Sequence, residues 1–173
     1  DRERVRQLLN LSPERMLPEA YAFREPVSPH WAAELDATVL DPAQLQIPEH
    51  QGPLVVETAG GLMVPLTRSW LQIDQLVQWQ LPIVLVARSG LGTLNHTLLS
   101  LEALKTRNLT VLGLILNGPL HGDNPGTLEQ FGDVRVLAQL PPQASLSATV
   151  LERLWQEQDL STTFRQVLNR TSP

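Results

Sequence analysis

The stretch LPIVLVARSGLGTLNHTLLSLEAL, residues 81–104, contains a strand, a glycine-rich loop and the start of a helix in that order. Its first part, 81–87, is a continuous apolar and largely β-branched run, which is typical of a strand covered on both faces. From residue 94 to 108, leucines recur at the spacing that places them on one face of an amphipathic helix. This stretch therefore predicts one βα unit of a parallel sheet.

Similar patterns extend on both sides of this unit. Further strands are predicted at 54–57, 109–116 and 134–140, and helices at 70–80, 127–132 and 147–170, the last as one helix or two with a break near Asp159. Strand and helix thus alternate four times, which favours an α/β fold with a parallel sheet and helices on both faces.

The region before residue 54 is less regular. Residues 1–10 are predicted to form a short helix, and 30–37 another, while 41–50 is a short helix or a loop. Four prolines between 11 and 30 predict an extended loop, because proline fixes φ and removes a backbone donor. A chain of 173 residues is long enough for one core, and we interpret 1–173 as a single domain.

Composition excludes several classes of protein. The net charge of −5 argues against a general nucleic-acid or anionic-membrane binder, and the apolar runs are strand-sized rather than membrane-spanning. The chain has no cysteine, so disulfide and thiolate chemistry are excluded. A cytoplasmic location is the natural expectation.

In open α/β sheets, ligands bind beyond the carboxyl ends of the strands. Glu57 with the following glycines suits a metal–phosphate site, or else a tight turn with an incidental acid. The loop before residue 94 suits an anion at a helix start, or else an ordinary N-cap by Thr93 or Asn95. Asn117 suits the edge of a nucleobase such as adenine, or else a turn.

Four stretches together resemble dethiobiotin synthetases: VVETAGGLMVPLT (55–67), residues 81–104, VLGLILNG (111–118) and YAFREPVSPHWAA (21–33). The resemblance runs from residue 1 to about 142. It implies a three-layer, P-loop NTPase-like fold and a homodimeric ligase of biotin biosynthesis. Such an enzyme converts 7,8-diaminononanoate, CO₂ and Mg-ATP to dethiobiotin through a phosphorylated carbamate.

The resemblance also implies the site residues. Asp1 and Glu57 are the expected Mg²⁺ ligands. The expected ATP-binding residues are Asp1, Glu57, Thr58, Ala59, Gly60, Asn117, Gly118, Pro141, Pro142 and Gln143, and the expected substrate-binding residues are Gly92, Thr93, Leu94 and Asn95. Thr58 stands where the family usually has glycine.

The family also has a phosphate loop ending in Gly-Lys-Thr and a catalytic lysine on the following strand, and neither occurs in this sequence. Its single lysine, Lys105, lies on a predicted helix away from the strand ends. We therefore expect the 173 residues alone to be inactive as a synthetase and to belong to a longer protein. The alternatives are a non-catalytic nucleotide-binding or regulatory domain, and a relative such as a cobyrinic-acid amidase or a partitioning ATPase.

Overall fold

The computed structural model describes residues 2–169. The chain divides into two compact units, and each is described by itself. The sheet unit comprises the described residues of 1–17 and 82–173, and the loop unit comprises residues 18–81.

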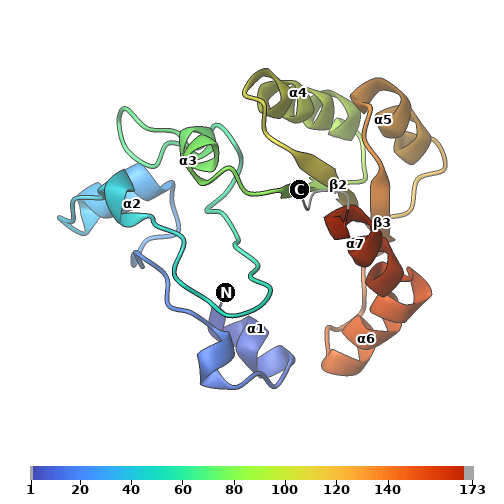
Figure 1. Ribbon diagram of the computed structural model, residues 1–173, viewed down its shortest axis with the longest axis horizontal. Helices are drawn as coiled ribbons and strands as arrows, with labels where there is room; N and C mark the ends of the chain where they lie inside the picture. The colour runs from blue at the N-terminus through green and yellow to red at the C-terminus, as the bar shows by residue number, and fades with distance from the viewer. Residues whose placement is uncertain (1, 170–173) are drawn as a thin grey trace. The chain divides into compact units, whose positions relative to one another are not determined.

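Three parallel strands form the sheet, in the order β1-β2-β3 (Figure 1). They are β1 (Ile83–Arg88), β2 (Val111–Asn117) and β3 (Val136–Leu140). Arg88 is level with Asn117, and Asn117 is level with Leu140. The three carboxyl ends therefore meet at one edge, which confirms three of the four predicted strands.

Helices α4 (Thr93–Thr106) and α5 (Asn124–Gly132) cover one face of the sheet. The core between these helices and the sheet is a cluster of four buried leucines, Leu101, Leu114, Leu116 and Leu128. Partly buried residues from all three strands pack against it. Leu101 belongs to the helical stripe that the sequence predicts. The spacing of the leucines in the sequence therefore predicts correctly which face of α4 is buried.

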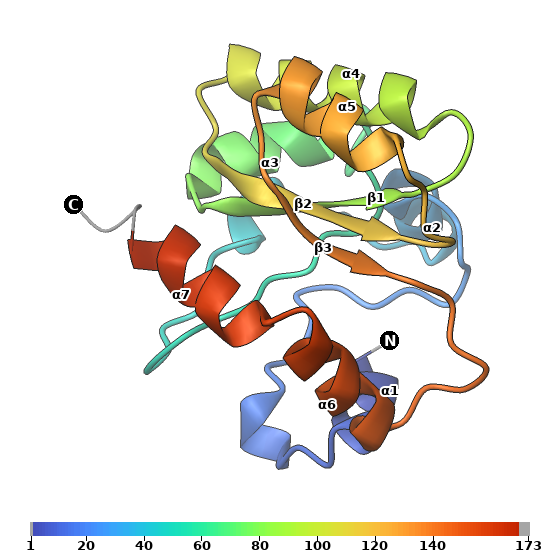
Figure 2. The ribbon, with the colours of Figure 1, turned by 90° about the vertical axis from the view of Figure 1, so that its right-hand side faces the viewer.

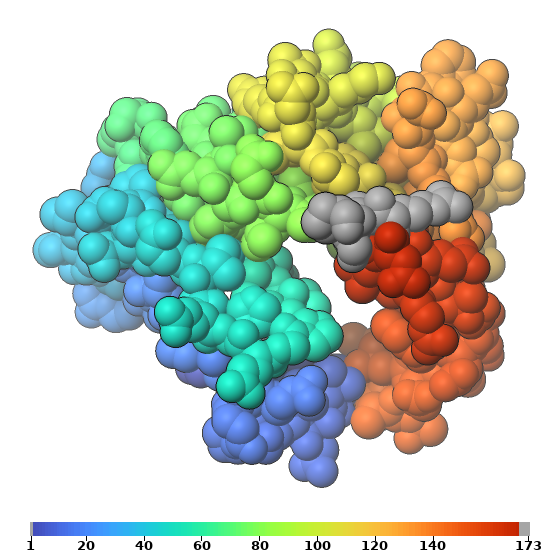
Figure 3. Space-filling model, in the orientation of Figure 1, coloured from blue at the N-terminus to red at the C-terminus, as the bar shows by residue number. Residues whose placement is uncertain are grey.

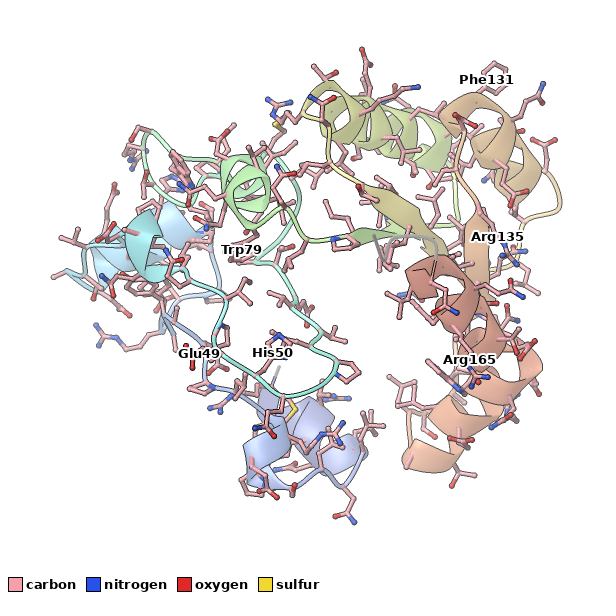
Figure 4. All side chains as sticks on the ribbon, viewed as in Figure 1. Glu49, His50, Trp79, Phe131, Arg135 and Arg165 are labelled. Carbon is pink, nitrogen blue, oxygen red and sulfur yellow. The ribbon has the colours of Figure 1, made fainter. Side chains whose placement is uncertain are left out.

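The C-terminal segment forms two helices, α6 (Ala148–Glu157) and α7 (Leu160–Asn169), and Figure 2 shows α7 on the sheet face opposite α4 and α5. Asp159 separates them with a φ of +45°, a left-handed conformation that ends a helix. Arg135, labelled in Figure 4, donates from Nη1 to Oε1 of Gln166 on α7 at 3.3 Å. The predicted break and the helices on both faces are confirmed.

The remaining elements are short. The sheet unit begins with α1 (Arg2–Leu8) and the 3₁₀ turn η1 (Pro13–Arg15), and the loop unit contains α2 (Pro29–Leu35), η2 (Pro42–Gln44) and α3 (Gln72–Trp79). The loop unit buries Ala32, Leu66 and Ile73. Its proline-rich start is irregular, as predicted. Among the described residues, no helix combines the length and apolar composition needed to cross a bilayer.

The prediction of a strand over 54–57 is wrong, because these residues form no regular structure. A strand needs a neighbouring backbone to pair with, and none of the described residues pairs with this segment. Val55 is 93% exposed. Figure 3 draws the segment around residues 50–60, in turquoise, with its atoms open to view. Glu57 therefore lies on a loop and not at a strand end. Whether 1–173 is a single domain stays a prediction.

Candidate functional site

Backbone hydrogen bonds join the three strand ends of the sheet unit. Ser89 N–H donates to the carbonyl of Asn117 at 3.2 Å, and Gly118 N–H donates to the carbonyl of Leu140 at 3.0 Å. The parallel register continues in this way for one residue beyond β1 and one residue beyond β2. The predicted nucleobase residues Asn117 and Gly118 thus lie between the loop that follows β1 and the loop that follows β3.

Gly118 is the tightest position at this edge. Its φ is +139°, and a Cβ added there would lie 2.5 Å from Oγ of Ser89. Only glycine fits both the backbone conformation and the close approach. The Ser89 side chain is 2% exposed, and its hydroxyl has no partner among the described residues. The path of the Asn117–Gly118 turn is therefore set by Ser89.

The start of α4 is built from the glycine-rich loop. Gly92 is the N-cap residue with a φ of +91°, and the buried Thr93 turns its hydroxyl inward to donate to the carbonyl of Arg88. Thr93 Oγ1 also lies 3.2 Å from Oγ1 of Thr97. In the described part of the chain, no acceptor is recorded for the backbone N–H groups of Leu94 and Asn95. These two donors, with the positive end of the helix dipole, suit an anion.

The third predicted loop is held by α6. Gln143 donates from Nε2 to the carbonyl of Pro141 at 2.8 Å, and its Oε1 accepts from Nη2 of Arg153 at 2.7 Å. Arg153 also pairs with Glu157. The loop from Pro141 to Gln143 therefore has a defined position at the end of β3, as a nucleotide-side loop needs.

A pocket of about 220 Å³ lies beside β1 and the first two turns of α4. Its polar lining includes Arg88, Thr93, His96, Thr97 and Ser100. Thr93 belongs to both this pocket and the predicted substrate-binding helix start. The pocket thus borders that helix start.

The loop unit carries the other predicted ATP-binding residues. Glu57 is exposed, and no hydrogen bond or ion pair of its carboxylate is recorded within residues 2–169. Thr58 uses its hydroxyl locally, donating to the carbonyl of Gly60 at 3.2 Å, while Ala59 is exposed. Gly60 has a φ of +87°. The loop therefore presents a free carboxylate on a tight turn.

Asp1 and Lys105 are the other two residues that the sequence singles out. Asp1 lies outside the described residues. Lys105 lies in the last turn of α4, at the opposite end of this helix from Gly92, as expected. In the described part of the chain, no three His, Cys, Asp or Glu side chains are grouped to hold a metal ion.

Sequence comparison identifies the family. A family model described as an AAA domain matches residues 1–150. The chain is 49% identical over 152 residues to the ATP-dependent dethiobiotin synthetase BioD of Rhodopseudomonas palustris, which covers 88% of this chain and 71% of the relative. The chain belongs to the dethiobiotin synthetase family.

Two further relatives show how much of each protein this similarity covers. The BioD enzyme of Nitrobacter hamburgensis is 46% identical over 151 residues, covering 87% of this chain and 71% of the relative. The biotin biosynthesis bifunctional protein BioCD of Bordetella avium is 49% identical over 158 residues, covering 91% of this chain but 34% of that protein. The dethiobiotin synthetase part of such a protein is therefore one portion of a longer chain.

Two residues that the sequence does not predict for the site, Ser89 and Asn124, also lie at this sheet edge. Asn124, at the start of α5, donates from Nδ2 to the carbonyl of Ser89 at 2.8 Å, and both residues are buried. Ser89 lies in the glycine-rich loop of residues 81–104, whereas Asn124 belongs to no recognisable motif. The one available signal was the position of Ser89 directly after a strand.

Proposed function

We propose that this protein is an ATP-dependent dethiobiotin synthetase, which converts 7,8-diaminononanoate, CO₂ and ATP to dethiobiotin, ADP and phosphate. One amine captures CO₂ as a carbamate, ATP phosphorylates the carbamate, and the second amine closes the ureido ring as phosphate leaves. The observation that carries the proposal is the 49% identity to a dethiobiotin synthetase over 88% of this chain. The common edge at which the carboxyl ends of β1, β2 and β3 lie also supports the proposal.

The Asn117–Gly118 turn is the proposed nucleobase site. The Asn117 side chain can donate and accept at once, which matches the donor and acceptor on the edge of adenine. The bonds from Ser89 to Asn117 and from Gly118 to Leu140 hold the turn before any nucleotide arrives. Pro141, Pro142 and Gln143 border it on the β3 side.

The start of α4 is the proposed site for the substrate carboxylate. The free N–H groups of Leu94 and Asn95 would donate to it, while Gly92 and Thr93 hold the helix start in place. Charge-assisted bonds of this kind are stronger than neutral ones. Because Thr93 uses its hydroxyl for Arg88, its role here is to shape the loop and not to contact the substrate directly.

The free carboxylate of Glu57 fits Mg²⁺. This metal prefers oxygen ligands and often takes one or two protein carboxylates, with phosphates and water completing its shell. Glu57 and Asp1 would hold the ion, which offsets negative charge on the ATP phosphates when bound.

A lysine at the phosphates has no candidate in this sequence. Phosphoryl transfer by this class of enzyme uses a lysine there, and the single lysine lies at the far end of α4. We propose that polypeptide outside the 173 residues supplies it. The same absence favours the second candidate, a non-catalytic nucleotide-binding or regulatory domain. Homodimer formation and a cytoplasmic location belong to the first proposal.

The test measures intact mass and activity on the same purified protein. We expect a mass above 19.2 kDa by at least a strand–loop–helix unit of roughly 30 residues. We also expect ADP release that depends on 7,8-diaminononanoate, with labelled CO₂ recovered in dethiobiotin. A reaction without diamine is the blank. ATP binding without diamine-dependent ADP release would support the non-catalytic domain instead.

A further inference from the structure

Asn124 is a buried polar side chain that lies far in sequence from the residue it binds. It is 7% exposed, and its Nδ2 donates to the carbonyl of Ser89 at 2.8 Å across 35 residues of sequence. Its own backbone N–H donates to Nδ1 of His121 at 3.1 Å. The side chain is therefore anchored at the start of α5 and directed into the sheet edge.

Ser89 is the point at which the two proposed subsites meet. Its N–H is bonded to the carbonyl of Asn117, so it holds the nucleobase turn. Its side chain packs against Gly118, where a Cβ would come within 2.5 Å of Oγ. Gly90, the next residue, accepts from Thr93 N–H at 3.1 Å and begins the loop that starts α4.

We propose that Asn124 is a positioning residue for nucleotide binding, acting through the carbonyl of Ser89. This inference rests on the proposed function, because it assigns a role at the same nucleobase turn. The N–H of Ser89 belongs to the peptide group before it and its carbonyl to the peptide group after it, so the two bonds fix the backbone of Ser89 on both sides of its Cα. The same residue then places Gly118, which lies against its side chain, and the loop from Gly90 to Gly92, which follows it.

A buried carbonyl that loses its donor is left unsatisfied, so the Ser89–Gly90 peptide group would turn to find another partner. This turn changes the backbone angles at Ser89, and it would therefore weaken the bond from Ser89 N–H to Asn117 and move Ser89 Oγ, which lies against Gly118. The effect is expected on the affinity for ATP and not on the folding of α5. Asn124 itself need not contact the nucleotide.

The test compares Asn124→Asp and Asn124→Ala with Thr127→Ala in the whole protein. Asn124→Asp keeps the size of the side chain and removes its donor. Thr127→Ala is the matched control, since it removes a 2.9 Å bond from Thr127 Oγ1 to Asp123 at the start of the same helix without touching Ser89. We measure the Kd for ATP, the melting temperature and hydrogen exchange of single amides.

We expect both Asn124 variants to bind ATP about tenfold more weakly, the change that loss of one buried hydrogen bond produces. The amides of Ser89 and Gly118 should exchange faster in these variants than in wild type, relative to the amides in the middle of β2. Thr127→Ala should bind ATP as wild type does. Wild-type affinity in both Asn124 variants, or equal weakening by Thr127→Ala, would overturn the inference.

The same measurements distinguish failure of the proposed function from failure of this inference. If the wild-type protein binds no ATP, the function proposed above is wrong, and hydrogen exchange alone decides the structural part. Unchanged exchange at Ser89 and Gly118 in the Asn124 variants would then overturn the inference. Faster exchange confined to those amides would support it.

Discussion

Gly118 shows how closely single residues determine the sheet edge. It combines a left-handed backbone with contact to the buried Ser89, so two separate effects oppose any side chain there. Because both effects act at Gly118, even one added methyl group should disturb the structure there. The consequence is measurable in stability and in ligand affinity.

We expect Gly118→Ala to lower the free energy of unfolding by about 2 kcal/mol, since a non-glycine residue in a disfavoured backbone region costs about that much. ATP affinity should fall as well, because the turn that carries Asn117 must move. Urea unfolding and ATP titration measure the two effects.

Gly126→Ala is the control for Gly118→Ala. Gly126 lies in α5, and a Cβ there would meet nothing within 4 Å. Alanine should be neutral or stabilise by up to about 1 kcal/mol, because it reduces the entropy of the unfolded chain. Equal losses in both variants would contradict the explanation from the contact with Ser89.

Thr93 provides a second prediction at this scale. Thr93→Val keeps the shape of the side chain but removes the hydroxyl that donates to the carbonyl of Arg88 in a buried place. We expect a loss of about 1–3 kcal/mol in the free energy of unfolding, the cost of leaving a buried acceptor unpaired. Thermal unfolding measures it.

The control is Thr106→Val, which removes a similar bond, from Thr106 Oγ1 to the carbonyl of Glu102 at 2.8 Å, at the exposed end of the same helix. Water can replace that donor, so the loss should stay below about 0.5 kcal/mol. A loss as large as that of Thr93→Val would show that helix propensity, and not burial, explains both.

Among the elements, α2 depends on charge at its C-terminus. Asp36 is the C-cap residue, and its carboxylate accepts from the backbone N–H of Arg24 at 3.1 Å and from Nε of Arg24 at 2.9 Å. The backbone bond from Arg24 first, and then its side-chain bond, hold the pKa of Asp36 below the ordinary value for aspartate. The Arg68 bond likewise lowers the pKa of Glu34 in the same helix.

Because a lowered carboxyl pKa stabilises the folded state above the unfolded pKa, this contribution should be lost as the pH falls through the folded pKa, below about pH 4. We expect Asp36→Asn to reduce the stability at pH 7 and to flatten its acid dependence. Unfolding midpoints between pH 7 and pH 3 measure this. Glu49→Gln, at an exposed carboxylate with no recorded bond in the described chain, should leave the acid dependence as in wild type.

For the molecule as a whole, the main core lies in the sheet unit. Leu114 in the middle of β2 is fully buried among Leu101, Leu116 and Leu128. Leu114→Ala should lower the free energy of unfolding by about 2–5 kcal/mol, from lost apolar burial and the cavity left behind. Leu99→Ala, on the outer face of α4 and 55% exposed, should cost less than about 1 kcal/mol. Similar costs would mean that the leucine cluster is not the core.

The sequence by itself determined β1, α4, β2, α5 and β3, because apolar runs and helical spacing are local properties, while it left open whether 147–170 is one helix or two. It also placed Asn117, Gly118 and the loop from Pro141 to Gln143 after strands of one sheet, since parallel strands end at a common edge, but it wrongly placed Glu57 at a strand end. The resemblance to dethiobiotin synthetases rested on the same local stretches, and comparison with known proteins confirms it.

Only the tertiary structure decided what depends on distant partners. Residues 54–57 have the composition of a strand, yet a strand forms by pairing, and no described segment pairs with them. The bond from Asn124 to Ser89 joins residues 35 apart, so neither residue's surroundings in sequence indicate it. Hydrogen bonds between distant backbone and side-chain groups exist only once the chain has folded, and they place the Asn117–Gly118 turn beside the loop that starts α4.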